Sequence, residues 1–132
     1  MIDYNSLYSG ALIEELLAMI PNLAKADLSN AMTVNLNRNG YAKFNNGLLI
    51  QWGYSSSSGR NKTIYLPTSF YDTNYSVLVT MKRTVDDTTN YTGDVWTQNK
   101  SSFLMFGLYH STDTNNGAFW GGFNWFAIGR WK

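Results

Sequence analysis

The sequence predicts an all-β fold, a small antiparallel β-sandwich preceded by a short N-terminal helix. Aromatic residues make up 16% of the 132 residues and charged residues 14%, and aromatic side chains favour strands. Two short apolar segments, residues 47–53 and 123–129, are too short for helices and end in glycine, as buried strands entering turns do. The chain is long enough for one core, and because it has no cysteine, packing must stabilise it.

The N-terminal segment is predicted to be an amphipathic helix over residues 9–20. Ser6 or Ser9 can cap its first turn, and Pro21 ends it. A helix of about twelve residues is marginal alone in water, so its apolar stripe needs a partner surface. That surface is either the sandwich or copies of the same helix, and the spacing alone favours neither. The stripe contains Leu12, Ile13, Leu16, Leu17 and Ile20.

A polar connector, residues 22–37, separates the helix from the rest of the chain. We therefore expect two parts. Residues 1–37 form the helix and connector, and residues 38–132 form the β domain.

From residue 39 onward, the sequence alternates between predicted strands and polar turns. Three Asn-Gly pairs, at 39–40, 46–47 and 116–117, predict type I′ hairpin turns, which require positive φ at both central residues. Residues 54–61, 85–92 and 111–116 are expected to be exposed loops. Strands are expected at residues 41–45, 47–53, 63–66, 75–81, 95–97, 102–109 and 123–129.

Nothing in the sequence predicts catalysis, a metal ion or a cofactor. His110 is the only histidine, and although Ser111 and Asp113 lie close to it, neighbouring residues of a strand point to opposite faces. The carboxylates show no spacing that predicts the facing pair of a glycosidase or the ligand set of a calcium loop. We expect a binding or structural protein.

Charge and hydropathy narrow the range of partners. A formal net charge of +1 provides no basic stripe for a nucleic acid. No apolar run approaches the length of a membrane span, and the first residues lack the pattern of a signal peptide. We expect no nucleic acid, no membrane insertion and no export signal.

The aromatic residues fall into two groups. Trp52, Phe103, Trp125 and Phe126 lie in apolar strands, which predicts core or intersubunit packing. The others lie beside polar loops, where an exposed ring flanked by amides and carboxylates can bind a sugar, although local packing under the loop is the alternative for each. These are Tyr54, Tyr91, Trp96, Tyr109, Phe119 and Trp120.

Three segments, NGLLIQWG, IYLPTSFYDTNYSVLVT and FNWFAIGRW, resemble the gp53-like family of bacteriophage tail-fibre C-terminal domains, over roughly residues 39–131. The resemblance implies a homotrimeric fibre tip in the virion that attaches to a bacterial surface glycan or protein without catalysis. It also favours a helical bundle between subunits over a docked helix. The implied trimer interface is Leu12, Ile13, Leu16 and Ile20.

We expect receptor contacts in the loops that combine aromatic rings with hydrogen-bonding groups. A monomeric carbohydrate-binding module is an alternative, although a monomer does not need the apolar stripe; a purely structural fibre-assembly domain is another. A depolymerising enzyme is disfavoured by the placement of the carboxylates. The candidate ligand-binding residues are Tyr91, Asp94, Trp96, His110, Asp113, Asn115, Asn116 and Trp120.

Overall fold

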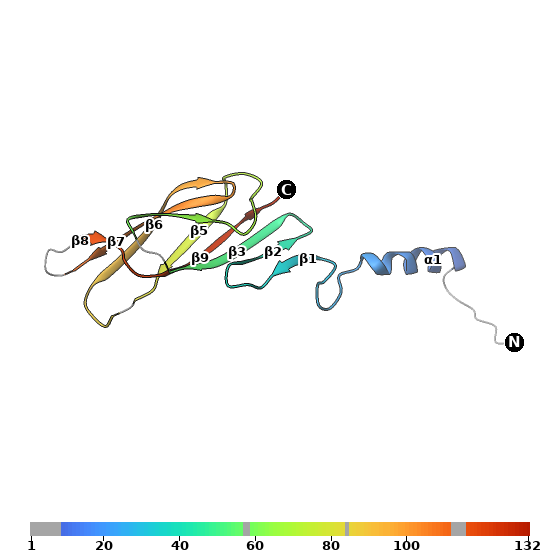
Figure 1. Ribbon diagram of the computed structural model, residues 1–132. Coiled ribbons are helices and arrows are strands. Elements are labelled where there is room, and N and C mark those ends of the chain that lie inside the picture. Colours follow the sequence, from blue (N-terminus) through green and yellow to red (C-terminus); the bar gives the residue numbers. More distant parts are fainter. Residues whose placement is uncertain (1–8, 57–58, 84, 112–115) are drawn as a thin grey trace. The chain divides into compact units, whose positions relative to one another are not determined.

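The computed structural model describes residues 9–56, 59–83, 85–111 and 116–132 (Figure 1). The chain divides into two compact units, Met1–Ala31 and Met32–Lys132. Each unit is described by itself.

The first unit contains the predicted helix, α1 (Gly10–Met19). The Ser9 hydroxyl caps it by accepting a hydrogen bond from the Leu12 backbone N–H at 3.2 Å. A short 3₁₀ turn with Pro21 near its start, η1 (Ile20–Asn22), follows directly. The apolar stripe is exposed on this helix, and no residue of α1 is buried.

The second unit is built from two antiparallel sheets with the core between them, which confirms the predicted all-β sandwich (Figure 1). The five-stranded sheet has the order β1-β2-β3-β9-β5. The four-stranded sheet has the order β4-β7-β6, and β8 pairs with the far end of β7. The strands are β1 (Met32–Asn35), β2 (Gly40–Phe44), β3 (Leu48–Ser55), β4 (Asn61–Tyr65), β5 (Ser76–Met81), β6 (Asn90–Asn99), β7 (Ser102–His110), β8 (Asn116–Ala118) and β9 (Phe123–Arg130).

Large aromatic side chains from both sheets fill the core. Phe103 on β7 and Trp125 on β9 are buried and meet edge to face, with ring centroids 5.7 Å apart. Gly53 on β3 makes room for Trp125, because a Cβ there would lie 2.4 Å from the indole ring. Core packing predicted for Phe103 and Trp125 is therefore confirmed. Trp52 and Phe126 are only partly covered and face away from the core.

The turn prediction at the three Asn-Gly pairs is wrong. Gly40 begins β2 and Gly117 lies inside β8, both without positive φ. Gly47 does turn the chain, with φ of 103° and its N–H donating to the Phe44 carbonyl at 3.0 Å, but Asn46 keeps ordinary φ, so the turn is not type I′. The side chain of Asn39 serves tertiary structure instead: its Oδ1 accepts from the Tyr54 N–H at 2.7 Å.

Three strand boundaries also differ from expectation. β1 lies within the segment expected to be connector, where the β-branched residues Thr33 and Val34 favour a strand and pair with β2. β6 starts at Asn90, five residues earlier than expected, because its polar residues face outward while β7 pairs along its whole length. The loop after Trp52 is shorter than predicted, since β3 extends to Ser55 and β4 begins at Asn61. Most of the predicted loop 111–116 lies outside the described residues.

Candidate functional site

The outer face of the four-stranded sheet carries the best-formed candidate site. Side chains alternate along β7, so Phe103 and Met105 enter the core while Phe106 and Leu108 face outward. The registers place Asp94 of β6 and Asn61 of β4 on either side of Phe106. An aromatic ring on the central strand is thus flanked by polar side chains on both neighbours.

A β-bulge adds a second aromatic ring to this face. The pairing of β6 with β7 shifts register between Val95 and Thr97, which leaves Trp96 unpaired. Its indole is 67% exposed and meets Phe106 edge to face at 6.2 Å. Beside the two rings is an open hollow of about 430 Å³, lined by Asp94, Val95, Trp96 and Phe106. We call it the Trp96 hollow.

The chemistry of the Trp96 hollow suits a ligand with both apolar faces and hydroxyl edges. Trp96 and Phe106 offer ring surface against which the C–H groups of a sugar can pack. The Asp94 side chain is exposed and offers carboxylate acceptors at the rim. The guanidinium of Arg60 lies 5.9 Å from the centre of the Phe106 ring and supplies donors.

A second group of candidates lies on the same face but farther along the strands. His110 pairs with Asn90 of β6 and with Asn116 of β8, and its Nδ1 lies 3.0 Å from Asn116 Oδ1. Trp96 lies six positions after Asn90 on β6, a span of about 20 Å in an extended strand. The His110–Asn116 pair is therefore too far from the Trp96 hollow for one sugar ring to contact both.

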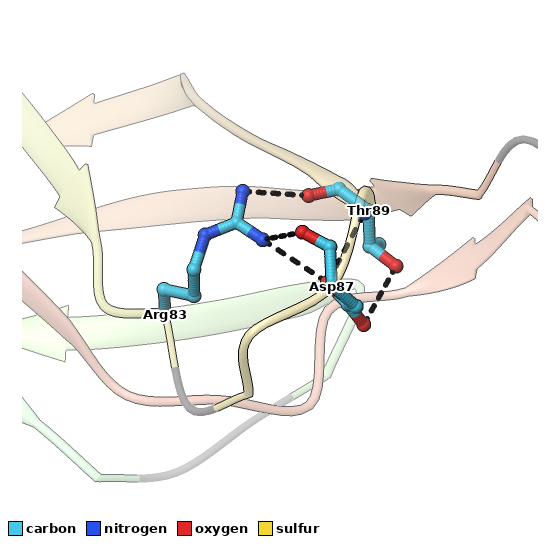
Figure 2. Close-up of polar contacts among 3 residues, drawn as sticks. All are labelled: Arg83, Asp87 and Thr89. Carbon is cyan, nitrogen blue, oxygen red and sulfur yellow. Dashed lines mark hydrogen bonds and ion pairs between the residues drawn. The ribbon is translucent and has the colours of Figure 1, made fainter.

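The segment between β5 and β6 is organised by one arginine (Figure 2). Arg83 donates to the Asp87 carboxylate at 3.0 Å and to the Thr89 carbonyl at 2.9 Å. The Asp87 carboxylate also accepts from the Thr89 N–H and hydroxyl, at 3.1 and 2.9 Å. The ion pair is exposed and contributes little alone, but together these bonds fix the shape of the segment.

This segment supports a small aromatic cluster. The Arg83 guanidinium lies 5.3 Å from the centre of the Tyr91 ring. Tyr91 meets Phe119 edge to face at 5.3 Å and Trp120 at 6.3 Å. Phe119 is buried in the core, and the Tyr91 hydroxyl is buried without a hydrogen-bond partner. Trp120 is 48% exposed and is the part of this cluster that reaches the surface.

The eight candidate ligand-binding residues thus fall into separate groups. Asp94 and Trp96 lie together in the hollow, His110 and Asn116 form a pair, and Tyr91 packs against Trp120. Asp113 and Asn115 lie outside the described residues.

Phe106, which completes the hollow, is not among the residues selected from the sequence. A signal for it was present, since Leu104, Phe106 and Leu108 alternate with the core residues of β7 and so give that strand two apolar faces.

Within the described ranges, no three His, Cys, Asp or Glu side chains gather as metal ligands would. Nor is any helix there of the length and apolarity that crossing a bilayer demands.

Comparison with known proteins points to fibres. The model of a family described as tail fiber protein gp53-like, C-terminal, matches residues 43–130. No curated protein sequence matches the chain. Two similar folds are an N-truncated R1-type pyocin tail fiber, with TM-score 0.62, 17% identity and coverage of 94% of this chain and 98% of that one, and an N-truncated R2-type pyocin tail fiber, with TM-score 0.60, 18% identity and coverage of 82% and 44%.

A third similar structure is the C-terminal part of the R2 pyocin fiber of P. aeruginosa, with TM-score 0.59 and 20% identity over 75% of this chain. The match spans 26% of that structure, and it spans 44% of the N-truncated R2-type fiber. The chain thus corresponds to less than half the length of these two structures.

Proposed function

Since the chain belongs to the family of gp53-like tail fibre C-terminal domains, we propose that it is the receptor-binding tip of a phage or pyocin-type fibre. In this role it resides in the assembled particle and attaches it to a glycan or protein on a bacterial surface, without catalysis. In the same proposal the tip is a homotrimer whose helices pack through Leu12, Ile13, Leu16 and Ile20, which accounts for the exposed apolar stripe of α1.

The Trp96 hollow is the single observation that supports receptor binding most strongly. A large aromatic side chain that is 67% exposed on a strand costs solvation free energy unless something packs against it. A bulge displays this ring beside a second ring, a carboxylate and a guanidinium, which is a combination that suits a glycan. We assign Trp96, Phe106 and Asp94 to receptor contact, with Trp120 and the His110–Asn116 pair as further contacts.

Three copies of a shallow site give strong attachment even when each binds weakly. Once one subunit holds the surface, the next site binds at a high effective concentration set by the rigid trimer. A change that weakens each site by about 1 kcal/mol is therefore magnified at the level of the whole tip.

The test is to make Trp96→Ala and Trp120→Ala separately and measure adsorption of each purified protein to susceptible bacteria. We expect Trp96→Ala to lower adsorption at least tenfold, because the platform is lost at all linked sites. Trp96→Phe should restore part of the binding, since it returns an apolar ring to the bulge.

Tyr71→Ala is a matched control, because Tyr71 is also an exposed aromatic residue, at 52%, but lies between β4 and β5 with its ring beside Arg130 of β9. Each variant should keep the wild-type mass and circular dichroism. Wild-type adsorption by both folded tryptophan variants would contradict the assignment and direct attention to Arg60 and the neighbouring serine-rich segment.

A further inference from the structure

The outer face of the five-stranded sheet is apolar from one edge almost to the other. The registers align Val34, Ala42, Ile50 and Ile128 in one row across β1, β2, β3 and β9, with Ser76 of β5 at its end. The next row contains Gly40, Trp52, Phe126 and Leu78 across β2, β3, β9 and β5. We call these two adjacent rows the apolar band.

Several members of the apolar band are well exposed in the single chain. Leu78 is 66% exposed, Val34 43%, and Phe126 and Ile128 37% each. An antiparallel sheet with one face in water normally alternates apolar residues inside with polar residues outside. Here β3 and β9 carry apolar residues on both faces, which is the pattern of strands that are covered on both sides.

The outer faces of the two sheets differ in polarity. On the four-stranded sheet, polar side chains such as Asp94 and Asn61 flank the apolar residues of β7. The apolar band has no charged residue, and the indole N–H of Trp52 already donates to the Asn37 carbonyl at 3.2 Å. The nearest charge along β9, Arg130, is paired with Asp72 at 2.7 Å.

We propose that a second copy of this chain covers the apolar band, so that the five-stranded sheet forms the subunit interface of the tip. The two rows carry no charged side chain, and an uncharged, largely apolar surface is typical of contacts between subunits. In a three-fold assembly the bands of the three subunits face a common axis, so that each band is covered by the neighbouring copies. The receptor face and the interface then lie on opposite sheets of one subunit.

The face could supply a large part, but not all, of a subunit contact. Five strands about 4.8 Å apart, each contributing about six residues at about 3.4 Å per residue, make a surface of about 24 by 20 Å, or roughly 500 Å². One partner of a specific protein–protein interface contributes about 800 Å². The face therefore supplies more than half of what a stable contact needs.

This inference rests on the proposed trimer, and the test separates the two. Leu78 is the best position, since it lies on the edge strand β5 and is not needed in the core. We expect Leu78→Asp to reduce the mass in sedimentation to a single chain with β-type circular dichroism retained. Tyr65→Asp is the matched control, because Tyr65 is 80% exposed on the outer face of the four-stranded sheet and should leave the mass unchanged.

A second measurement avoids any effect of the charge on folding. The chain has no cysteine, so Leu78→Cys and Tyr65→Cys each introduce one thiol. We expect a thiol reagent such as DTNB to react at least tenfold more slowly with the Leu78→Cys protein than with the Tyr65→Cys protein.

Each other outcome overturns the inference in a different way. A multimeric wild type whose Leu78→Asp variant keeps its mass, or equal thiol rates at the two positions, would leave the trimer standing but place its interface elsewhere. A protected Leu78→Cys thiol that is released by Leu16→Asp with Ile20→Asp, with no change of mass, would identify α1 as the cover. A single-chain mass for the wild type would overturn both the interface and the trimer, while the adsorption of Trp96→Ala still tests receptor binding.

Discussion

Tyr75 joins the two sheets through a single side chain. It precedes β5 of the five-stranded sheet, and its hydroxyl lies 2.8 Å from the Asn99 carbonyl and 2.9 Å from the Ser102 carbonyl at the β6–β7 turn of the other sheet. Its ring stacks on Phe70 at 4.2 Å. Burial of the hydroxyl raises the pKa of Tyr75 from its usual 10.0 to about 12.

Tyr75→Phe should keep the ring packing and lose the hydroxyl bonds. We expect the free energy of unfolding at pH 7 to fall by about 1–2 kcal/mol, because buried carbonyl groups lose their donor. Since the pKa is raised in the folded protein, the wild type should also lose stability from about pH 10 to about 12, where the unfolded chain releases this proton and the folded chain retains it. The variant should lack that part of the alkaline loss.

Urea unfolding at pH 7 and at several values up to pH 12 measures both effects. Tyr65→Phe is a suitable control, since the Tyr65 side chain is largely exposed. An unchanged midpoint at pH 7, together with the same alkaline decline in Tyr75→Phe as in the wild type, would show that the hydroxyl does not connect the sheets.

Among the elements, α1 stands out because its apolar side chains are exposed. Its N-cap, Ser9, and its end at Met19, two residues before Pro21, follow from the sequence. Within the described residues of its own unit, nothing buries its apolar stripe. A helix of ten residues is marginal in water on its own, so association is the consistent role for this stripe.

Changing Leu16→Asp together with Ile20→Asp should weaken association, because both side chains are about half exposed in the single chain and the carboxylates would have to be desolvated between helices. We expect the midpoint concentration for dissociation to rise at least tenfold in sedimentation, while β-type circular dichroism remains.

Glu14→Gln with Glu15→Gln is the matched control, since it changes two neighbouring polar residues of the same helix. If the double aspartate variant dissociated no more readily than this control, α1 would have no part in assembly.

The strand elements show why the sequence predicts some features of the site and misses others. β3 and β9 were predictable because their apolar runs are short and rich in β-branched and aromatic residues. The bulge at Trp96 was not, because it arises from how β6 pairs with β7, and a register shift has no signature within one strand. The sequence could therefore select Trp96 and Asp94 as candidates but could not place Phe106 beside them.

At the scale of the whole molecule, the fold class follows from the short apolar and alternating segments of the sequence, while the grouping of the candidate residues depends on tertiary structure. Tyr91 and Trp120 are far apart in sequence, yet β6 and the chain after β8 bring their rings within 6.3 Å. β1 lies in a segment expected to be connector, and it belongs to the sheet because all of its residues pair with β2. Local sequence patterns predict the individual strands. Which side chains meet on a surface depends instead on the registers between strands that are distant in sequence.

The outer faces of the two sheets are suited to different contacts. The apolar band on one sheet is suited to contact between subunits, and the Trp96 hollow on the other to contact with a receptor. The isolated tip should therefore bind a receptor by itself. Fluorescent labelling of the full chain and flow cytometry with a panel of bacterial strains measure this binding.

We expect saturable binding to at least one strain, blocked by an excess of unlabelled wild type and not by the same excess of Trp96→Ala. Saturable binding that both proteins block equally, or binding to no strain by a folded trimer, would contradict this expectation.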